Sequence, residues 1–570
     1  MLSHLSHMGH LGVWLIAVAA PAAAVVFAVL WAFFPSGRVP RWRIRHMRVR
    51  VKLRLYPGRG HATLAELGRY WSRRAVYRQS GRARPSLTAA QRRRHPDAHS
   101  IRLGTAHLGR GLRVPVNQNV VVMSPPQAGK TAWLASVILH YPGPVLSTTT
   151  KHDLFQLTSG VRARGRPVHV FNPQRVGGVT STFSWNLIED CTDPATAIRR
   201  ADAFTEGMSM KGVEDGSWWK GKASDYWRAF FHAAALAGYN FWHVARWVLA
   251  GGGEEAEEIL YDHGNGEWAS QLTELRSSAD KTTATIRMSM SRILAFFYDP
   301  QLAVSVLPAP GYGLRIEEFL RDRGSLYLIA ESRGEDSPLA PLFACLTTEI
   351  HYLASLLGSQ MPTGRLDPPL LMALDEVTQI CPVPVPSWLA DSGGKGIQVI
   401  TVAHGEAQLR SRWGPDGARA ILDTSGTKLF LPGISDPAIL NMASTLCGEA
   451  GLREHGDDLK YRHPVMTPDM IRELPDGHAL VVRLNNRPVI AQLPKAWDDP
   501  AYKQARQDGQ AVATLAPAPT APPLPPAAHA TRAAGVSSGA EARRVPRLMP
   551  PQVPPAPPPA APPQPYEWNV

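Results

Sequence analysis

Short apolar runs recur through the middle of the chain, and most are followed by a stretch with helical spacing. We expect strands at 119–123, 144–147, 168–171, 325–330, 370–374, 398–402 and 428–431, with a terminal pair at 479–483 and 488–491. Apolar strands that alternate with helices are typical of a parallel α/β sheet. The pattern therefore predicts one α/β domain around a parallel sheet, formed by residues 117–194 and 308–508.

The alternation is interrupted between residues 195 and 307, where Ala and aromatic residues recur at helical spacing. The segment 225–237 is apolar enough to suggest a membrane span, but Arg228 and His232 lie within it. We therefore interpret residues 195–307 as an all-α domain inserted into the α/β domain.

A long apolar segment near the N-terminus, residues 11–34, has no charged residue. About 20 such residues cross a bilayer as a helix, so residues 1–36 are expected to form a single transmembrane anchor. A cleaved signal peptide is the alternative, although it would need basic residues before the apolar core, and the sequence has none there.

Basic residues follow this apolar segment directly. The formal net charge of the chain is +14, and residues 35–115 contain 21 Lys or Arg but only two acids. By the positive-inside rule, we expect the N-terminus outside the cell membrane and the C-terminal body in the cytoplasm. Residues 37–116 are interpreted as a basic juxtamembrane region and connector. Basic and apolar residues alternate in its stretch 41–54, which is expected to bind either anionic lipid headgroups or nucleic-acid phosphate.

The last part of the chain, residues 509–570, is rich in Pro and Ala. Such a composition buries too little apolar surface to fold, so we expect a disordered tail. The four cysteines are widely spaced and show no metal-ligand pattern, which predicts reduced, mostly buried thiols.

A phosphate-binding loop is indicated directly after the run 119–123, by the sequence Ser-Pro-Pro-Gln-Ala-Gly-Lys-Thr. The general P-loop pattern is G-x-x-x-x-G-K-[ST] between a strand and a helix. The two prolines lack a backbone N–H, so phosphate donors must come from the last five residues of the loop. Lys130 is expected to reach the β- and γ-phosphates, and Thr131 to bind Mg²⁺. The candidate nucleotide-binding residues are Ser124, Gln127, Ala128, Gly129, Lys130 and Thr131. A Gly-Lys-Thr turn without a ligand is the alternative.

A second apolar run, 370–374, ends in Asp375 and Glu376. Acidic residues are also common at helix starts, so the pair gains meaning only together with the phosphate-binding loop. In that combination we expect Asp375 to hold Mg²⁺ and Glu376 to orient or deprotonate the attacking water. The sequence thus predicts an ATPase that needs ATP and Mg²⁺, with Lys130, Asp375 and Glu376 as catalytic residues and Thr131 and Asp375 as metal ligands.

Residues 117–500 resemble the type IV secretion coupling proteins, the membrane ATPases of conjugative DNA transfer. The resemblance rests on an ordered set of features: the loop 124–131, Thr150-Lys-His-Asp-Leu154, Phe171-Asn-Pro173, a helical insertion, Asp375-Glu376, and the segment 396–410 followed by Trp413-Gly414. It implies an anchored homo-hexamer of RecA-like P-loop NTPase domains. Such motors use ATP to bring a relaxase-bound, single DNA strand to the components of a secretion channel.

The resemblance also implies a polar sensor of the γ-phosphate after the strand 398–402. His404 stands where the family usually has Gln, and Gln408 is a second candidate. Many family members have an Arg before this strand that acts across the subunit interface, whereas this chain has Lys395, a poorer bidentate donor. The family usually has two membrane spans, and this sequence predicts one.

Two other functions fit the same residues. One is a septal-type translocase that moves double-stranded DNA. The other is a membrane scaffold that binds nucleotide without hydrolysing it, which the departure from the usual loop at Ser124-Pro-Pro126 motivates.

Overall fold

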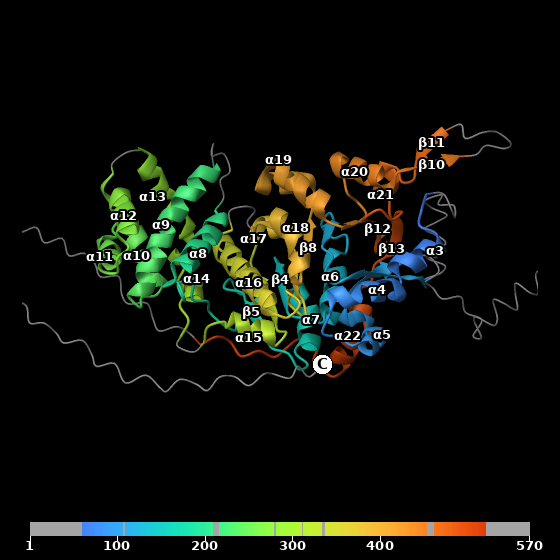
Figure 1. Ribbon diagram of the computed structural model, residues 1–570, viewed down its shortest axis with the longest axis horizontal. Coiled ribbons are helices and arrows are strands. Elements are labelled where there is room, and N and C mark those ends of the chain that lie inside the picture. The colour runs from blue at the N-terminus through green and yellow to red at the C-terminus, as the bar shows by residue number, and fades with distance from the viewer. Residues whose placement is uncertain are drawn as a thin grey trace, which may run out of the picture. The chain divides into compact units, whose positions relative to one another are not determined.

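A single large sheet organises the part of the chain that the structure describes (Figure 1). The structure is a computed structural model, and it describes residues 60–106, 109–208, 216–278, 281–309, 312–332, 337–452 and 461–519. The predicted anchor, residues 11–34, and most of the predicted tail, residues 520–570, lie outside these described residues.

The sheet has eleven strands in the order β2-β1-β13-β12-β9-β3-β8-β7-β4-β6-β5. Seven neighbouring strands are parallel: β9 (Thr427–Phe430), β3 (Val120–Met123), β8 (Ile397–Ala403), β7 (Leu370–Leu374), β4 (Val145–Thr149), β6 (Ser325–Ile329) and β5 (Val168–Phe171). Their apolar side chains are buried, as expected for a parallel sheet covered on both faces. These seven strands confirm the predicted α/β class.

The remaining four strands extend the sheet in antiparallel fashion, so the sheet is mixed. They are β12 (His478–Arg483), β13 (Val489–Gln492), β1 (Ser100–Thr105) and β2 (Gly111–Pro115). The sequence predicts the first two as a terminal pair, but it places the last two in the connector. β1 and β2 therefore belong to the same sheet as β3, the strand that precedes the phosphate-binding loop.

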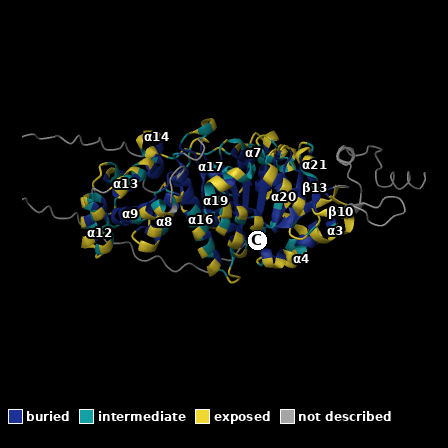
Figure 2. Cartoon of the chain, turned by 90° about the horizontal axis from the view of Figure 1, so that it is seen from above, coloured by how far each residue is buried: buried dark blue, intermediate teal, exposed yellow. Residues whose placement is uncertain are grey.

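Helices surround the sheet, and their outward sides are exposed (Figure 2). Those of the α/β part are α6 (Lys130–His140), α7 (Asp153–Arg162), α15 (Ile316–Arg321), α16 (Ala340–Gln360), α17 (Val377–Ile380), α18 (Val385–Lys395), α19 (Glu406–Thr424), α20 (Pro437–Cys447), α21 (Pro468–Arg472) and α22 (Pro500–Gln507). A small hairpin, β10 (Glu449–Leu452) and β11 (Tyr461–Pro464), follows α20. Among the described residues, only α16 is long and apolar enough to cross a membrane, and it is mostly buried. We assign it to the protein core.

The region predicted as an all-α insertion is helical throughout its described residues (Figure 1). Its helices are α8 (Pro194–Glu206), α9 (Gly216–Leu236), α10 (Phe241–Leu249), α11 (Glu254–Asp262), α12 (Gly266–Ser277), α13 (Lys281–Ile293) and α14 (Pro300–Ala303). The aromatic residues of α9 form a core, because Trp227, Phe230 and Phe231 are almost fully buried. α8 joins this bundle to α16, since the Arg199 guanidinium donates two hydrogen bonds of 2.9 Å to Glu349.

Short helices precede the sheet: α3 (Leu64–Glu66), a π-helical turn (Leu67–Trp71), α4 (Arg73–Ala83) and α5 (Ala89–Arg94). A buried ion pair connects them to the core, because the side chains of Arg84 and Asp367 are each only 6% exposed. The second carboxylate oxygen of Asp367 accepts a hydrogen bond from the Ser86 N–H at 2.8 Å. Arg84 Nη1 also donates to the Ala98 carbonyl at 2.5 Å. Asp367 thus neutralises the one deeply buried arginine of this region.

The chain continues in contact with the body for some residues beyond the predicted end of the fold. The Ala513 N–H donates to Ser159 Oγ at 3.1 Å, and the Ala518 N–H donates to the Ser181 carbonyl at 2.8 Å. Leu515 packs against a buried cluster that includes Phe155 and Tyr327. We call residues 510–519 the C-terminal strap. Its packing shows that the predicted disorder does not begin at residue 509.

The four cysteines are all buried and free, as predicted. Burial raises the pKa of the Cys191, Cys381 and Cys447 thiols to about 12. These thiols are therefore protonated at neutral pH and act as small apolar groups.

We predict that Asp367→Ala lowers the free energy of unfolding by about 3 kcal/mol, because it leaves the buried Arg84 charge without its partner. Urea denaturation of the full chain in detergent, followed by Trp fluorescence, measures this change. As a control, Asp508→Ala removes the exposed ion pair of Arg164 and Asp508. That variant should change the free energy by less than about 1 kcal/mol. Equal effects of the two variants would contradict the prediction.

Candidate nucleotide-binding site

Three adjacent parallel strands, β3, β8 and β7, end at the same edge of the sheet. The phosphate-binding loop follows β3, His404 follows β8, and Asp375 and Glu376 follow β7. In open α/β sheets, this carboxyl edge is where ligands bind. The fold therefore brings together two sequence segments that are far apart in the chain, as the motifs predict.

The phosphate-binding loop has the backbone conformation that an anion site needs. Gly129 has φ of +93°, in the left-handed region that favours glycine, and α6 begins at the next residue. No atom lies within 4 Å of a Cβ built on Gly129, so the space beside this backbone is open. The N-terminus of α6 presents its free N–H groups at this opening.

Ser124 is predicted to contact the nucleotide, but its hydrogen-bond donors are used within the protein. Its N–H donates to the Ala403 carbonyl at 3.0 Å, and its hydroxyl donates to the Pro125 carbonyl at 3.0 Å. The residue is fully buried. Both of its donors are thus committed, which favours a role in fixing the loop against β8 over direct contact with phosphate.

Lys130 lies between the two predicted acidic residues. Its Nζ donates a hydrogen bond to Glu376 Oε1 and lies 3.1 Å from Asp375 Oδ1. Burial alone would lower the pKa of Lys130, but the charges of Asp375 and Glu376 outweigh burial and raise it. Lys130 is therefore a permanent cation at the carboxyl edge, and it must turn away from these carboxylates to reach a phosphate.

His404 bridges the loop and the acidic pair. Its Nδ1 lies 2.7 Å from the Ser124 carbonyl oxygen, and its Nε2 lies 2.8 Å from Glu376 Oε1. Both partners can only accept hydrogen bonds, so both ring nitrogens must carry a proton. The hydrogen bond to Glu376 correspondingly raises the pKa of His404. The geometry therefore describes an imidazolium that contacts both halves of the site.

Glu376 is the centre of this network. Burial alone would raise its pKa, but the hydrogen bond from His404 and the charge of Lys130 lower it to about 2. Its backbone is left-handed, with φ of +54°, which is uncommon for a residue with a side chain and clusters at functional sites. Gln379 Nε2 also donates to Glu376 Oε2, at 3.3 Å. Glu376 is thus an ionised, firmly oriented carboxylate at neutral pH.

Asp375 has the chemistry of a metal ligand. Burial raises its pKa, and its buried Oδ1 has the Lys130 ammonium as an ion-pair partner at 3.1 Å. A buried carboxylate needs such a cation, and a metal ion can take the place of the ammonium group. The backbone of Asp375 is held by Thr148, whose hydroxyl donates to its carbonyl at 2.8 Å.

The predicted metal ligands, Thr131 and Asp375, fit Mg²⁺ only as part of a shared site. The described residues contain no group of three or more His, Cys, Asp or Glu side chains that could hold a metal ion. Mg²⁺ usually binds through one or two protein groups, waters and substrate phosphates. The Asp375 carboxylate lies on the same edge as the phosphate-binding loop and, among the described residues, is paired only with the movable Lys130 side chain, so it fits that pattern.

Two glutamines support the site. The sequence predicts Gln408 as a candidate sensor of the γ-phosphate, and it does not indicate a role for Gln379. Gln408 Oε1 accepts a hydrogen bond from the backbone N–H of His404 at 3.2 Å, so Gln408 holds the backbone of the loop that carries His404. Gln379, which the sequence analysis did not single out, holds Glu376. Its position three residues after Glu376 at the start of α17 was the available clue, because residues at that spacing share a helix face. Lys395 pairs with Asp391 of its own helix.

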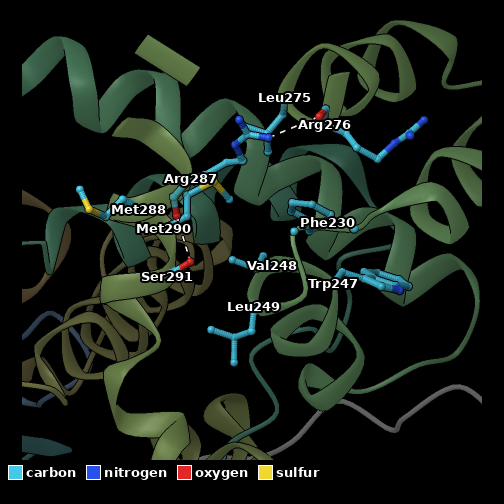
Figure 3. Close-up of a pocket in the computed structure, with 12 residues that line it drawn as sticks. Phe230, Trp247, Val248, Leu249, Leu275, Arg276, Arg287, Met288, Met290 and Ser291 are labelled. Carbon is cyan, nitrogen blue, oxygen red and sulfur yellow. Dashed lines mark hydrogen bonds between the residues drawn. The ribbon is translucent and has the colours of Figure 1, made fainter. Parts of the chain in front are cut away.

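A second hollow lies within the inserted helical domain (Figure 3). This cavity of about 170 Å³ is lined by side chains that include Phe230, Trp247, Leu275 and Met290. Its Arg276 is already paired with Glu254 and Glu257. The other guanidinium that lines it, that of Arg287, donates to the carbonyls of Arg276 and Ser278. The candidate nucleotide site is therefore the carboxyl edge of β3, β8 and β7, where the phosphate-binding loop lies.

A protein-family model matches the part of the chain that contains the acidic pair and His404. Residues 369–476 match the family model TraG-D_C, described as the TraM recognition site of TraD and TraG. The matched residues include Asp375, Glu376 and His404 but not the phosphate-binding loop. A search of curated protein sequences finds no match.

Solved structures with a similar fold include bacterial conjugative coupling proteins. A trigonal crystal form of TrwBdeltaN70 in complex with sulphate is 17% identical, with a TM-score of 0.52 over 68% of this chain and 88% of that chain. The unbound monoclinic form is 16% identical, with a TM-score of 0.51 over 75% and 94% of the two chains. The plasmid coupling protein TrwB in complex with ADP and Mg²⁺ is 15% identical, with a TM-score of 0.50 over 68% and 89%. The resemblance to coupling proteins that the sequence motifs indicate is thereby confirmed.

The bonds of His404 predict a pH dependence of stability. A group whose pKa is raised in the folded protein stabilises the fold fully below its unfolded pKa, near 6.5, and this contribution is lost as the pH rises through the folded value. We therefore expect His404→Gln to lower the melting temperature more at pH 6 than at pH 9. Thermal unfolding of both proteins across this range measures the difference. The exposed His95, changed to Gln, is the control, and a pH-independent effect of His404→Gln would contradict the assignment.

Proposed function

We propose that this chain is a membrane-anchored, ATP-hydrolysing motor that couples a DNA substrate to a type IV secretion channel. One observation carries the proposal: Lys130, Glu376 and His404 meet in one hydrogen-bonded network at the carboxyl edge of the sheet. The match of residues 369–476 to the TraG-D_C family supports the assignment to conjugative transfer rather than to another P-loop process.

The network contains the groups that hydrolysis needs. Glu376 is ionised at neutral pH, so it can accept a hydrogen bond from an attacking water and orient it, and its basicity rises when Lys130 no longer lowers its pKa. Lys130 and the N-terminus of α6 would hold the phosphates, while Thr131 and Asp375 would hold Mg²⁺. ATP bound with Mg²⁺ supplies the phosphoanhydride that is cleaved. His404 couples the two halves of the site, because it contacts both Glu376 and the loop carbonyl of Ser124.

Lys130 has two alternative sets of partners, and this gives the site a simple order of events. In the structure its ammonium group is hydrogen-bonded to Glu376. Lys130 would turn from Glu376 to hold the phosphates, which would leave Glu376 available to interact with water. A nucleotide-binding scaffold without turnover would have no need for an oriented, ionised Glu376, so the geometry favours hydrolysis over the scaffold alternative.

The assembly and its setting follow from the same proposal. The chain crosses the cell membrane once, with the N-terminus outside and the ATPase body in the cytoplasm. It works as a homo-hexamer on a relaxase-bound, single DNA strand and delivers it to the channel components. The basic segment 35–115 and the similarity to coupling proteins support this arrangement.

Exchange of the catalytic carboxylate tests the activity directly. We expect Glu376→Gln to lower kcat for ATP hydrolysis by about 10² or more, as for loss of a general base, while nucleotide binding is kept. Lys130→Ala should lose binding as well. Phosphate release and nucleotide binding by the full chain in detergent measure both effects. The matched control is Glu473→Gln, an exposed residue of the same type. Hydrolysis at the normal rate by Glu376→Gln would exclude the proposed base.

The form of DNA distinguishes the proposal from a septal-type translocase. We expect single-stranded DNA to stimulate ATP hydrolysis by the full chain more strongly than duplex DNA of the same length. A coupled assay of phosphate release at fixed salt measures the two rates, because binding to both forms is salt-dependent. Stronger stimulation by the duplex would favour the translocase that moves double-stranded DNA.

A further inference from the structure

We propose that the arginine-rich side of α4 and its neighbours binds anionic lipid headgroups and thereby holds the ATPase body against the membrane. We call this surface the arginine ridge, and it consists of Arg69, Arg73, Arg74, Arg78, Arg82, Arg93 and Arg94, all of them exposed. The inference rests on the membrane anchoring proposed above, and it adds a second, reversible contact between this chain and the bilayer.

The ridge carries a positive charge that the protein does not neutralise. Residues 60–99 contain nine arginines but only two acids, Glu66 and Asp97. Both acids already have partners outside the ridge, since Glu66 lies 3.6 Å from Arg487 and Asp97 lies 2.7 Å from Arg113. Within the part of the chain that the structure describes, no carboxylate forms an ion pair with a ridge arginine. The ridge therefore attracts an external anion.

The arginines are arranged as a row. Arg74, Arg78 and Arg82 follow one another at four-residue intervals, so they lie on one side of α4, about 6 Å apart along the helix axis. The opposite side of α4 includes the buried Ala75, Val76 and Ala83. Because that side is packed against the protein, the arginine side is fixed toward solvent.

The second helix extends the row into a surface. The Arg93 guanidinium of α5 lies over the Tyr77 ring of α4, 5.5 Å from its centroid. This contact places the end of α5 beside α4, so Arg93 and Arg94 add to the charge of the row. A surface of several cations can contact several headgroups at once, which a single arginine cannot.

Exposed apolar side chains at the start of the same region favour a lipid surface over nucleic acid. Leu64 is 45% exposed and Tyr70 is 37% exposed, and the guanidinium of Arg69 lies over the Tyr70 ring at 5.4 Å. A leucine finds no partner on a phosphate backbone, whereas apolar side chains flanked by arginines insert into the boundary of headgroups and acyl chains. In the sequence, the region also follows the apolar segment 11–34 and its basic flank.

The ridge is separate from the nucleotide site. α4 packs against β2, the outermost strand, and four strands lie between β2 and β3 in the sheet. Changes of ridge arginines should therefore leave basal ATP hydrolysis unaltered, and this allows the two proposals to be tested independently.

The test uses the full chain in nanodiscs of phosphatidylcholine, with and without phosphatidylglycerol. Phenylglyoxal modifies accessible arginines, and peptide mass spectrometry gives the rate at each ridge residue. We expect several-fold slower modification in discs that contain phosphatidylglycerol, and recovery of the rate at high salt, which screens exposed charges. The triple variant Arg74→Glu, Arg78→Glu, Arg82→Glu should lose the protection of Arg73, Arg93 and Arg94.

A matched variant carries the same change of charge elsewhere: Arg315→Glu, Arg321→Glu, Arg472→Glu, all at exposed positions. It should keep the protection of the ridge. Equal modification rates in both kinds of disc, with normal ATP hydrolysis, would overturn the ridge proposal alone. Protection by DNA in neutral discs but not by phosphatidylglycerol would overturn it in favour of nucleic acid. A chain that does not enter the discs would overturn the anchoring and the ridge together.

Discussion

The nucleotide site depends on the position of β8 between β3 and β7. Because of this order, the loop after β8 projects His404 between the phosphate-binding loop and the acidic pair. Two carboxylates are then balanced by two cations, Lys130 and the His404 imidazolium. Such a cluster is stable only while each charge has a partner. An added anion would compete with the two carboxylates for these cations, so a change of charge at one member of the cluster affects all the others.

The sequence predicts the elements of this site well, because the elements are local. Apolar runs mark the seven parallel strands, and the loop 124–131 and the pair Asp375-Glu376 are recognisable without coordinates. The order of the strands in the sheet cannot be predicted from the same local patterns. Nothing in the local pattern of 398–402 says that this strand lies between the other two, so the two hydrogen bonds of His404 could not be derived. The hydrogen bond of the Ser124 backbone N–H depends on the same strand, because its acceptor is the carbonyl of Ala403 at the end of β8.

The sequence indicates only possible strand pieces in the connector 96–116, and there is a physical reason why it does not predict β1 and β2 as part of the main sheet. β1 and β2 are short, and the charged residues Arg102 and Arg113 interrupt their apolar pattern. Their hydrogen bonds are made with each other and with β13, which is almost 400 residues away in the chain. The buried Arg483 of β12 strengthens this connection, because it donates to the Tyr70 carbonyl at 2.8 Å and to Gln118 Oε1 at 2.9 Å. The described residues 60–106 and 109–115 are thus part of the same folded body as the candidate nucleotide site.

The C-terminal strap gives Gly160 of α7 its importance. A Cβ at this position would lie 1.9 Å from the Gln510 carbonyl oxygen, so the strap backbone can approach α7 only because the residue is glycine. Beyond it, Leu515 shields the cluster of Phe155 and Tyr327 from water. A protease that cuts the chain near residue 510 would remove the C-terminal strap. The apolar cluster of Phe155 and Tyr327 would then be exposed and prone to aggregation. The boundary for limited proteolysis and for shortened versions of the chain therefore lies after residue 519.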